Sequence, residues 1–419
     1  MSETKYFPTV EAIDKASQVL DEILEPTPFQ RNANLSDIYG ADVYLKREDL
    51  QMVRSYKIRG AYNKIRTIDP ELVKNGIVCA SAGNHAQGVA FSCSKLKIMG
   101  SIYMPTTTPK QKIEQVRMFG KEYIDIVLTG DTFDAANAAA IEYAGKSGKT
   151  FIPPFDDEKI IEGQGTIGRE ILSQCKEPLD YIFVPIGGGG LASGLGSYIK
   201  QVSPKTKVIG VEPGGAPCMK TAIEQGHVVE LDHIDKFVDG AAVKKAGCKT
   251  YEICKDVLDD IIVVPEGAVC TAIIQMYNKS AIVVEPAGAL SAAALRFYAD
   301  KIKGKTVACV VSGSNNDITR MEEIREKSLL YEGLKHYFIV NFPQRSGAVL
   351  SFIRDVIGPS DDLVYIQYIR KTNKESGPAL IGIEVSSPDD FKALIRRMDA
   401  HGISYEYINE NNKLFEILI

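Results

Sequence analysis

The sequence predicts an α/β protein with mainly parallel sheets, followed near the C-terminus by a smaller unit of βαββαβ order. Two observations predict this fold. Short apolar runs alternate with helix-length segments from about residue 40 to 315, which is typical of parallel sheets with crossover helices. Near Thr319 the chain becomes charged and helix-prone, and a different order of elements follows. We therefore expect two units.

The first unit alternates strands and helices along its whole length. Its expected strands cover residues 41–46, 76–80, 101–104, 123–128, 181–186, 207–212, 259–265 and 307–313. Helix-like segments lie between them, among them residues 84–97, 132–146 and 190–202. This alternation favours parallel pairing, because a parallel strand pair needs a long crossover connection.

The second unit follows a linker helix expected over residues 321–335. After it we expect strand, helix, strand, turn, strand, helix and strand at residues 336–342, 346–358, 363–372, 373–377, 379–385, 388–402 and 403–408. This is the order of ferredoxin-like domains. The predicted domains are therefore residues 1–320 and 336–419, joined by the linker helix.

Composition restricts the class of protein. A chain of 419 residues is long enough for two or three domains. The net charge of −5 and the lack of a Lys/Arg run argue against a nucleic-acid partner. The N-terminus is polar and no apolar run is long enough to span a bilayer, so we expect no membrane partner. The eight cysteines are scattered without zinc-ligand spacing, which predicts a cytoplasmic protein without a structural metal.

Residues 54–61, RSYKIRGA, raise the question of what Lys57 does. The lysine follows Tyr56 and lies close in the chain to Arg54 and Arg59. A lysine among positive charges has a reason to lose its proton, and a neutral amine is a nucleophile. The alternative is an ordinary helix surface with solvated cations.

PIGGGGLASG (185–194) follows an expected strand and opens an expected helix. Four consecutive glycines leave their backbone N–H groups unobstructed, so that they can bind a phosphate at the helix N-terminus. Residues 187–192 also match G-x-G-x-x-A, and Glu212 closes the next strand about where a ribose-binding acid would lie. A nicotinamide-dependent oxidoreductase is therefore a rival interpretation.

CASAGNHAQG (79–88) is a second strand-to-helix turn. Ser81, Gly83, Asn84 and His85 bracket the start of the helix, which suits a carboxylate ligand. The Asn84 amide can both donate and accept, although it could also simply cap the helix.

Ser312, in VVSGSNND (310–317), stands at the C-terminal end of a strand, where open α/β sheets bind ligands. An ordinary turn serine is the alternative. A lysine, two anion cradles and this hydroxyl together suit a cofactor with one phosphate, an aldehyde and a ring nitrogen. A nicotinamide enzyme would leave residues 54–61 and 79–88 without a role.

These motifs, with FVDGAAVKK (237–245), resemble in order and spacing the threonine dehydratases of the tryptophan-synthase-like pyridoxal-phosphate enzymes. The resemblance covers essentially the whole chain. It implies a two-lobed catalytic fold whose smaller lobe, about residues 53–154, is inserted in the larger one, and a single C-terminal ACT-like regulatory domain. It further implies pyridoxal 5′-phosphate as cofactor and the deamination of L-threonine to 2-oxobutanoate, the first step of isoleucine biosynthesis.

The resemblance also implies roles for individual residues. Lys57 would bind the cofactor covalently and act as general base, with Tyr56 packed near the ring. Asn84 would hold the 3′-oxygen, and Ser312 the ring nitrogen. The substrate carboxylate would be bound at Ser81, Gly83, Asn84 and His85, and the phosphate by the backbone of Gly187, Gly188, Gly189, Gly190 and Leu191.

Two residues differ from those of relatives in this group, and the choice between two substrates stays open. Ala82 stands where serine racemases of this group carry a second serine, so racemisation is not expected. Cys218 stands where some relatives that bind a divalent cation carry an acid, six residues after Glu212, which argues against a divalent metal and leaves a monovalent ion open. L-Serine differs from L-threonine by one methyl group, worth only about 1–3 kcal/mol, so a serine/threonine deaminase with a purely structural tail remains an alternative.

The presence of a single ACT-like domain in the chain leads to expectations about the effector and the oligomeric state. The resemblance implies feedback regulation by isoleucine through the ACT-like domain. One copy per chain then predicts an effector pocket where units of different chains meet, in a homo-oligomer such as a dimer or tetramer. A non-enzymatic amino-acid sensor on the same scaffold is a further alternative, although every residue needed for the chemistry is present.

Overall fold

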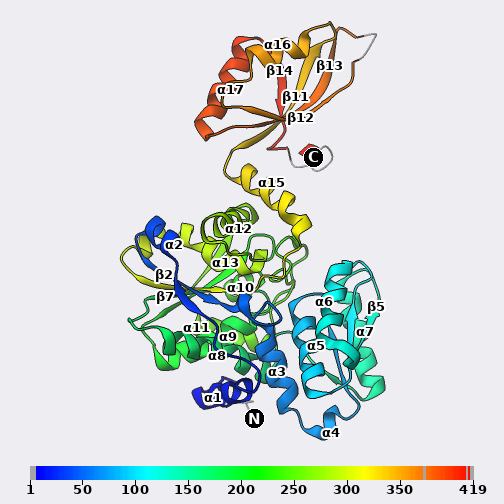
Figure 1. Cartoon of the computed structure of the whole chain (residues 1–419), viewed down its shortest axis with the longest axis vertical. Coiled ribbons are helices and arrows are strands. Elements are labelled where there is room, and N and C mark those ends of the chain that lie inside the picture. Colours follow the sequence, from blue (N-terminus) through cyan, green and yellow to red (C-terminus); the bar gives the residue numbers. More distant parts are fainter. Residues whose placement is uncertain (1–5, 371–373, 412–413, 416–419) are drawn as a thin grey trace. The chain divides into compact units, whose positions relative to one another are not determined.

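The structure, a computed structural model, describes residues 6–370, 374–411 and 414–415. It divides into two compact units, the first ending at Asp317 and the second beginning at Ile318. Figure 1 shows the chain coloured along its sequence. Within the described residues, no helix combines the length and the hydropathy that a membrane crossing requires.

A six-stranded sheet forms the centre of the larger lobe of the first unit, in the order β1-β2-β10-β7-β8-β9. Its strands are β1 (Phe29–Arg31), β2 (Asp42–Arg47), β10 (Thr306–Val311), β7 (Tyr181–Pro185), β8 (Lys207–Pro213) and β9 (Asp260–Val264). All neighbours pair in parallel except β1 and β2. The prediction of mainly parallel sheets is confirmed, although the three-residue β1 was too short to be predicted.

A separate four-stranded sheet forms the smaller lobe, in the order β5-β4-β3-β6. Its strands, all parallel, are β5 (Ile124–Leu128), β4 (Gly100–Met104), β3 (Ile77–Ala80) and β6 (Thr150–Phe151). Helices α5 (Asn84–Leu96), α6 (Lys110–Gly120) and α7 (Phe133–Ser147) belong to this lobe (Figure 1). Its buried core is distinct from that of the larger lobe.

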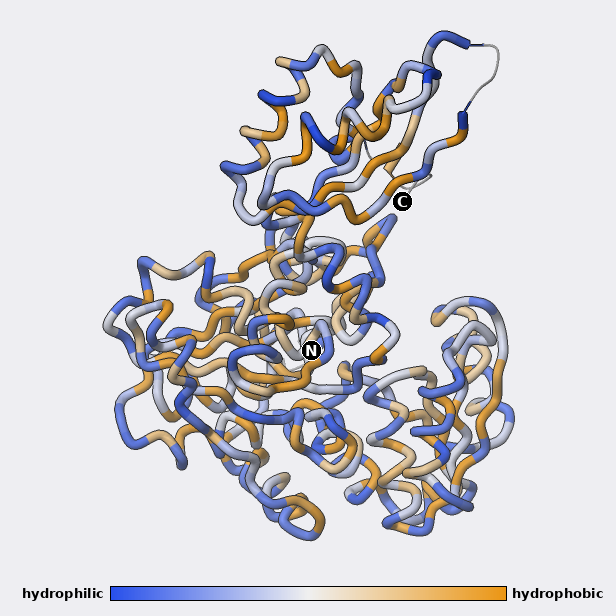
Figure 2. The backbone as a smooth tube through the Cα atoms, turned by 45° about the horizontal axis from the view of Figure 1, so that its top comes forward, coloured by the Kyte–Doolittle hydropathy of each residue, from blue (hydrophilic) through white to orange (hydrophobic). Residues whose placement is uncertain are grey.

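The other helices of the first unit belong to the larger lobe or join the lobes, except α4 (Pro70–Val73), whose Val73 packs against the core of the smaller lobe. They are α1 (Val10–Leu20), α2 (Ala33–Tyr39), α3 (Lys57–Thr67), α4, α8 (Glu158–Gln174), α9 (Gly190–Val202), α10 (Cys218–Gln225), α11 (Cys248–Val257), α12 (Glu266–Ser280), α13 (Pro286–Ala294) and α14 (Ala299–Ile302). Hydrophobic stretches of the tube in Figure 2 run through the interior of this unit, and residues 307–311 of the inner strand β10 are completely buried.

The second unit contains helix α15 (Met321–Tyr331) and a four-stranded antiparallel sheet in the order β12-β13-β11-β14. Its elements follow as β11 (Lys335–Pro343), α16 (Ala348–Asp355), β12 (Asp362–Tyr368), β13 (Ser376–Glu384), α17 (Pro388–Ala400) and β14 (Ser404–Tyr407). The predicted βαββαβ order is confirmed. The predicted turn begins at residue 373 and the strand before it was predicted to end at 372, and both positions lie outside the described residues.

Helix α3 packs against α8 with almost no side chain between the two backbones. A Cβ atom on Gly163 of α8 would lie 2.8 Å from the carbonyl oxygen of Arg59, so only glycine allows this approach. Lys57 is the first residue of α3. The close contact therefore fixes the position of Lys57 relative to the larger lobe.

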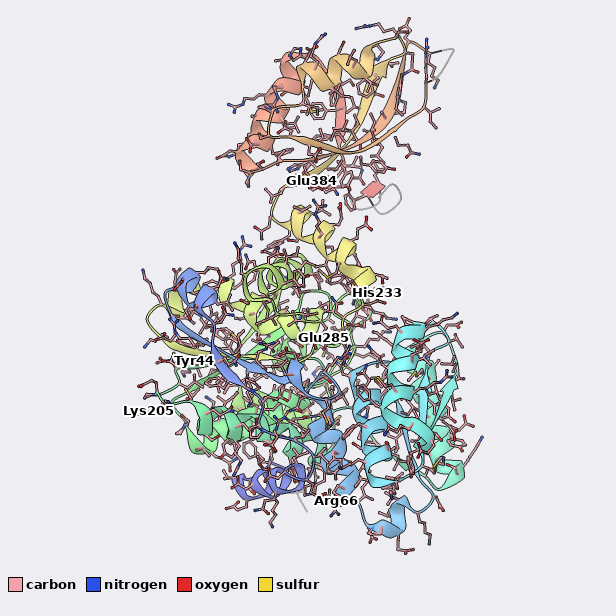
Figure 3. The ribbon with its side chains drawn as sticks, viewed as in Figure 1. Tyr44, Arg66, Lys205, His233, Glu285 and Glu384 are labelled. Carbon is pink, nitrogen blue, oxygen red and sulfur yellow. The ribbon has the colours of Figure 1, made fainter. Side chains whose placement is uncertain are left out.

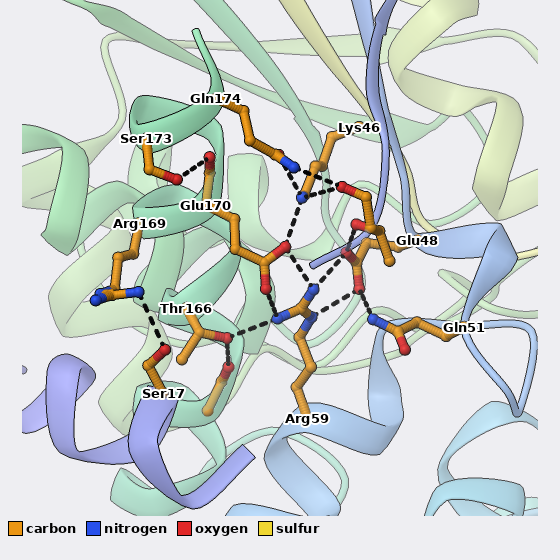
Figure 4. Close-up of polar contacts among 12 residues, drawn as sticks. Ser17, Lys46, Glu48, Gln51, Arg59, Thr166, Arg169, Glu170, Ser173 and Gln174 are labelled. Atoms are coloured by element: carbon orange, nitrogen blue, oxygen red, sulfur yellow. Dashed lines mark hydrogen bonds and ion pairs between the residues drawn. The ribbon is translucent and has the colours of Figure 1, made fainter. Parts of the chain in front are cut away.

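A buried ion-pair network, drawn in Figure 4, ties the same helix to its surroundings. Arg59 donates from Nε to Glu48 at 2.8 Å and from Nη1 to Glu170 at 2.5 Å. Lys46 Nζ donates to the same Glu170 at 2.5 Å. Arg59, Lys46 and Glu48 are at most 1% exposed. Burial of charges is tolerated only when their donors and acceptors are satisfied, and here each charge has several partners.

Replacing Arg59 with methionine tests this network. The change leaves Glu48 and Glu170 buried without their guanidinium partner, so we expect the free energy of unfolding to fall by about 3–5 kcal/mol. Arg31→Met is the matched control, because the Arg31–Asp42 pair is exposed (45% and 58%) and should contribute at most about 1 kcal/mol. Urea unfolding measures both. Equal, small losses would show that the buried network does not stabilise the unit.

Candidate active site

Residues from both lobes line one cavity at the carboxyl ends of β7 and β10. Five of the residues predicted from the sequence are among them: Tyr56, Lys57, Asn84, Gly187 and Ser312. Because β7 and β10 are parallel neighbours, the segments that follow them emerge at the same edge of the sheet. The cavity therefore gathers motifs that lie far apart in the sequence.

Lys57 is partly buried, and its Nζ donates to the carbonyl oxygen of Pro154 at 2.9 Å. Burial lowers the pKa of Lys57 to about 8, and the nearby Glu285 only partly opposes this shift. The expectation that neighbouring arginines lower this pKa is wrong. Arg54 is exposed, and Arg59 is occupied by the buried network. Removal of the amine from water is the physical cause.

The segment that carries Lys57 is held against the end of β10. Tyr56 N donates to the carbonyl oxygen of Ser312 at 3.1 Å, and Ser55 forms an antiparallel bridge with Gly313. Lys57 Nζ lies 5.4 Å from the centre of the Tyr56 ring. Lysine and serine are thus positioned by direct backbone hydrogen bonds.

Ser312 is 2% exposed and follows the last residue of β10. Its hydroxyl donates to the carbonyl oxygen of Ala287 at 3.2 Å. A hydroxyl has one O–H donor that can rotate about its bond to carbon, so Ser312 can turn this donor from Ala287 toward the cavity without carrying a charge.

Asn84 is the first residue of α5, and Gly83 occupies the cap position without a side-chain bond. The alternative that Asn84 caps the helix is therefore wrong. Its Nδ2 donates to Glu285 Oε1 at 2.6 Å, and its Oδ1 accepts from Asn315 Nδ2 at 2.6 Å. Both ends of the amide are fixed at the wall of the cavity.

The remaining residues of this turn contribute backbone rather than side chains. Ser81 Oγ accepts from the backbone N–H of Gly83 at 3.2 Å. The ring of His85 is 3% exposed and bonds the carbonyl oxygen of Ile152 at 3.0 Å. Burial, together with Lys57, lowers the pKa of His85 to about 3, so this ring is neutral. The first N–H groups of α5 lack partners within the helix and can receive a carboxylate.

The tetraglycine turn joins β7 to α9 and has no room for side chains. Gly189 has φ +93°, in the left-handed region that favours glycine. A Cβ atom on Gly188 would lie 2.3 Å from the Phe155 ring. The turn therefore presents bare backbone at a helix N-terminus, which suits a phosphate. With Lys57 and Ser312 on the same cavity, the residues fit a phosphorylated aldehyde cofactor with a ring nitrogen.

Glu212 is completely buried and does not face a ligand. Its two carboxylate oxygens accept from the backbone N–H groups of Met219, at 2.7 Å, and Lys220, at 2.8 Å. Burial raises the pKa of Glu212 to about 7. The acid closes the N-terminal turn of α10, so it is not available for a ribose. The nicotinamide interpretation thereby loses its ribose-binding residue.

Glu285 is a residue of the cavity that the sequence did not reveal. It is 4% exposed, and burial, with Asp239 as a further contribution, raises the pKa of Glu285 to about 7. An acid before Pro286 at a helix start looks like an ordinary cap, but it makes no side-chain cap bond. Gly240, Ala241 and Ala287 also line the cavity.

Comparison with known families accounts for nearly the whole chain. The family described as pyridoxal-phosphate dependent enzyme matches residues 20–313, and the C-terminal regulatory domain of threonine dehydratase matches residues 326–418. The biosynthetic L-threonine dehydratase IlvA of Halalkalibacterium halodurans is 57% identical over 98% of this chain and 99% of its own length. That of Bacillus subtilis is 55% identical over 98% and 97%.

A solved structure agrees with these matches. The processed form of threonine deaminase isoform 2 from Solanum lycopersicum superposes with a TM-score of 0.72 at 38% identity. The match covers 78% of this chain and 96% of that chain. The two-lobed catalytic fold is therefore shared with an experimentally determined relative.

The pKa of Lys57 gives a prediction for cofactor uptake. A neutral amine is the reactive form, so the rate at which the cofactor-free protein takes up pyridoxal phosphate should rise with pH and level off above about pH 8. An ordinary lysine would keep gaining reactivity up to its pKa of 10.5. Stopped-flow absorbance across this range measures the rate. A rate that continues to rise to the ordinary value would contradict the burial of Lys57.

Gly188→Ala tests the need for bare backbone in the tetraglycine turn. The added methyl group would overlap the Phe155 ring, and overpacking costs about 1–3 kcal/mol. We therefore expect cofactor affinity to fall by roughly tenfold or more, measured by absorbance titration. Gly145→Ala in α7 is the control, because its Cβ meets nothing within 4 Å, and its affinity should not change. Full affinity in the Gly188 variant would exclude a tight cradle.

Proposed function

The chain belongs to the pyridoxal-phosphate-dependent enzymes, among the biosynthetic threonine dehydratases, and we propose that it converts L-threonine to 2-oxobutanoate and ammonia. Its cofactor is pyridoxal 5′-phosphate. The single observation that carries the proposal is the placement of the buried amine of Lys57 in one cavity with Asn84, Gly187 and Ser312. The relatives named for threonine support this substrate over other amino acids.

Four sets of residues would hold the cofactor. Lys57 would bind it covalently, Asn84 would bind an oxygen of its ring, and Ser312 its ring nitrogen. The backbone from Gly187 to Leu191 would hold its phosphate at the start of α9. When bound, the cofactor draws electrons away from the substrate Cα.

The residues of the chain supply binding and proton transfer. Lys57 Nζ would remove the α-proton as general base, a role that suits its pKa of about 8. The carbonyl oxygen of Pro154 accepts from this Nζ and so orients it. The turn from Ser81 to His85 would bind the substrate carboxylate through the first backbone N–H groups of α5. Ser312 offers a hydroxyl rather than a carboxylate, which permits an uncharged ring nitrogen.

An assay of the purified protein with L-threonine tests the proposed reaction. We expect 2-oxobutanoate and ammonia in equal amounts, and a value of kcat/KM for L-serine lower by about tenfold, since one methyl group distinguishes the two. Lys57→Ala removes both the covalent bond and the base, so kcat should fall at least about a thousandfold. Mass spectrometry of the products measures turnover. A preference for L-serine, or activity without Lys57, would contradict the proposal.

The regulatory unit leads to a second part of the proposal. The match of residues 326–418 to a threonine dehydratase regulatory domain supports feedback by isoleucine. With one such unit per chain, the effector pocket would form between chains of a homo-oligomer.

All eight cysteines are free, which supports a reducing, cytoplasmic compartment.

Isoleucine titration of the full chain tests this regulation. We expect L-isoleucine to lower threonine turnover and to shift the oligomeric state in sedimentation, while D-isoleucine, the matched control, does neither. If L-isoleucine alters neither activity nor assembly, the unit is a structural tail.

A further inference from the structure

Glu285 is a buried carboxyl group at the cofactor cavity to which the proposed chemistry gives no role. Figure 3 labels Glu285 in the first unit, where it is 4% exposed. Space for it depends on two glycines from other segments: a Cβ on Gly313 would lie 2.5 Å from Glu285 Oε1, and one on Gly240 would lie 3.3 Å away. The carboxyl group of Glu285 is thus closely packed against these two glycines beside the cavity.

The Glu285 carboxylate accepts hydrogen bonds from the backbone N–H of Asn315 and from the side chain of Asn84. Asn84 Nδ2 donates to Glu285 Oε1 at 2.6 Å, while Asn315 donates to the Asn84 oxygen, also at 2.6 Å. An amide carries one oxygen and two N–H donors. A reversed amide would place its oxygen against the carboxyl oxygen and its NH₂ group against the NH₂ group of Asn315. Glu285 and Asn315 together therefore permit only one orientation of the Asn84 amide. In this orientation, neither Glu285 nor Asn315 binds the second N–H of Asn84.

We propose that Glu285 is a positioning residue for cofactor binding, which fixes the Asn84 amide so that its second N–H is available to an oxygen of the cofactor. This inference rests on the proposed role of Asn84. It adds to that role a reason why the amide presents a donor rather than an acceptor to the cavity.

The hydrogen bond from Asn84 to Glu285 does not depend on whether the Glu285 carboxyl group is charged. Lys57, Lys112, Asp239 and the Tyr56 hydroxyl all interact with it electrostatically, and its pKa lies at about 7. The group therefore changes protonation near neutral pH. Either form keeps a carbonyl-type oxygen that accepts from Asn84. Glutamine, which has the same shape and the same acceptor, should replace it well, whereas leucine should not.

A double-mutant cycle in the full chain tests the coupling. The dissociation constant of pyridoxal phosphate is measured by absorbance titration for the wild type, E285L, N84A and the double variant. E285L removes the acceptor and should weaken binding about tenfold, the value of one hydrogen bond. If Glu285 acts through Asn84, the same change in the N84A background should weaken binding by less than about twofold.

Two further variants separate this role from a structural one. E285Q should bind the cofactor within about threefold of the wild type, because the acceptor is kept. E212L is the matched control for E285L, since Glu212 is also a buried acid with a pKa of about 7, and it should not reproduce the effect of E285L. If E285L does not fold by circular dichroism, E285D, which draws the acceptor back, takes its place in the cycle.

The outcomes distinguish the two proposals. Equal effects of E285L in both backgrounds, E285Q as weak as E285L, or an equal loss in E212L would overturn the positioning role. If N84A alone leaves the dissociation constant unchanged, the proposed role of Asn84 fails and this inference fails with it. If N84A weakens binding but the two changes add, only the inference about Glu285 fails.

Discussion

The ion pairs that surround Arg59 are the interaction on which the catalytic unit depends most. The guanidinium donates to Glu48, Glu170 and Thr166, and both acids have further buried partners. Such a group is costly to remove from water, and only a nearly complete set of hydrogen bonds offsets that cost. Because Arg59 lies in the first turn of α3, which begins at Lys57, the same contacts hold the reactive amine in place.

A fixed helix allows the lysine to be buried without support from an acid in direct contact. The carbonyl oxygen of Pro154 takes one N–H of Lys57, and Glu285 interacts with it only through space. The resulting low pKa keeps a fraction of the amine neutral near physiological pH, as the proposed covalent binding and proton abstraction would require. Burial therefore has two effects here: it holds α3 rigidly in place, and it lowers the pKa of Lys57 so that part of the amine is neutral.

The sequence predicted most of the fold, because strands, turns and helix starts leave local patterns. Residues 185–194 and 79–88 could be assigned as strand-to-helix turns from their glycines and polar residues alone. The short strands β1 and β6 could not, since they are too short to show a period. Glu285 and the Arg59 network were missed for a different reason. Their partners are distant in the chain, as with Arg59 and Glu170, which are 111 residues apart, and burial of a charge has no local signature.

The central claim is that Lys57 is the residue that carries the cofactor, and borohydride reduction followed by peptide mass mapping tests it most directly. We predict that the purified protein is yellow, that reduction bleaches it, and that a pyridoxyl group is then found on the peptide containing Lys57. A pyridoxyl group on a different lysine, or a visible band that borohydride leaves unchanged, would contradict the account.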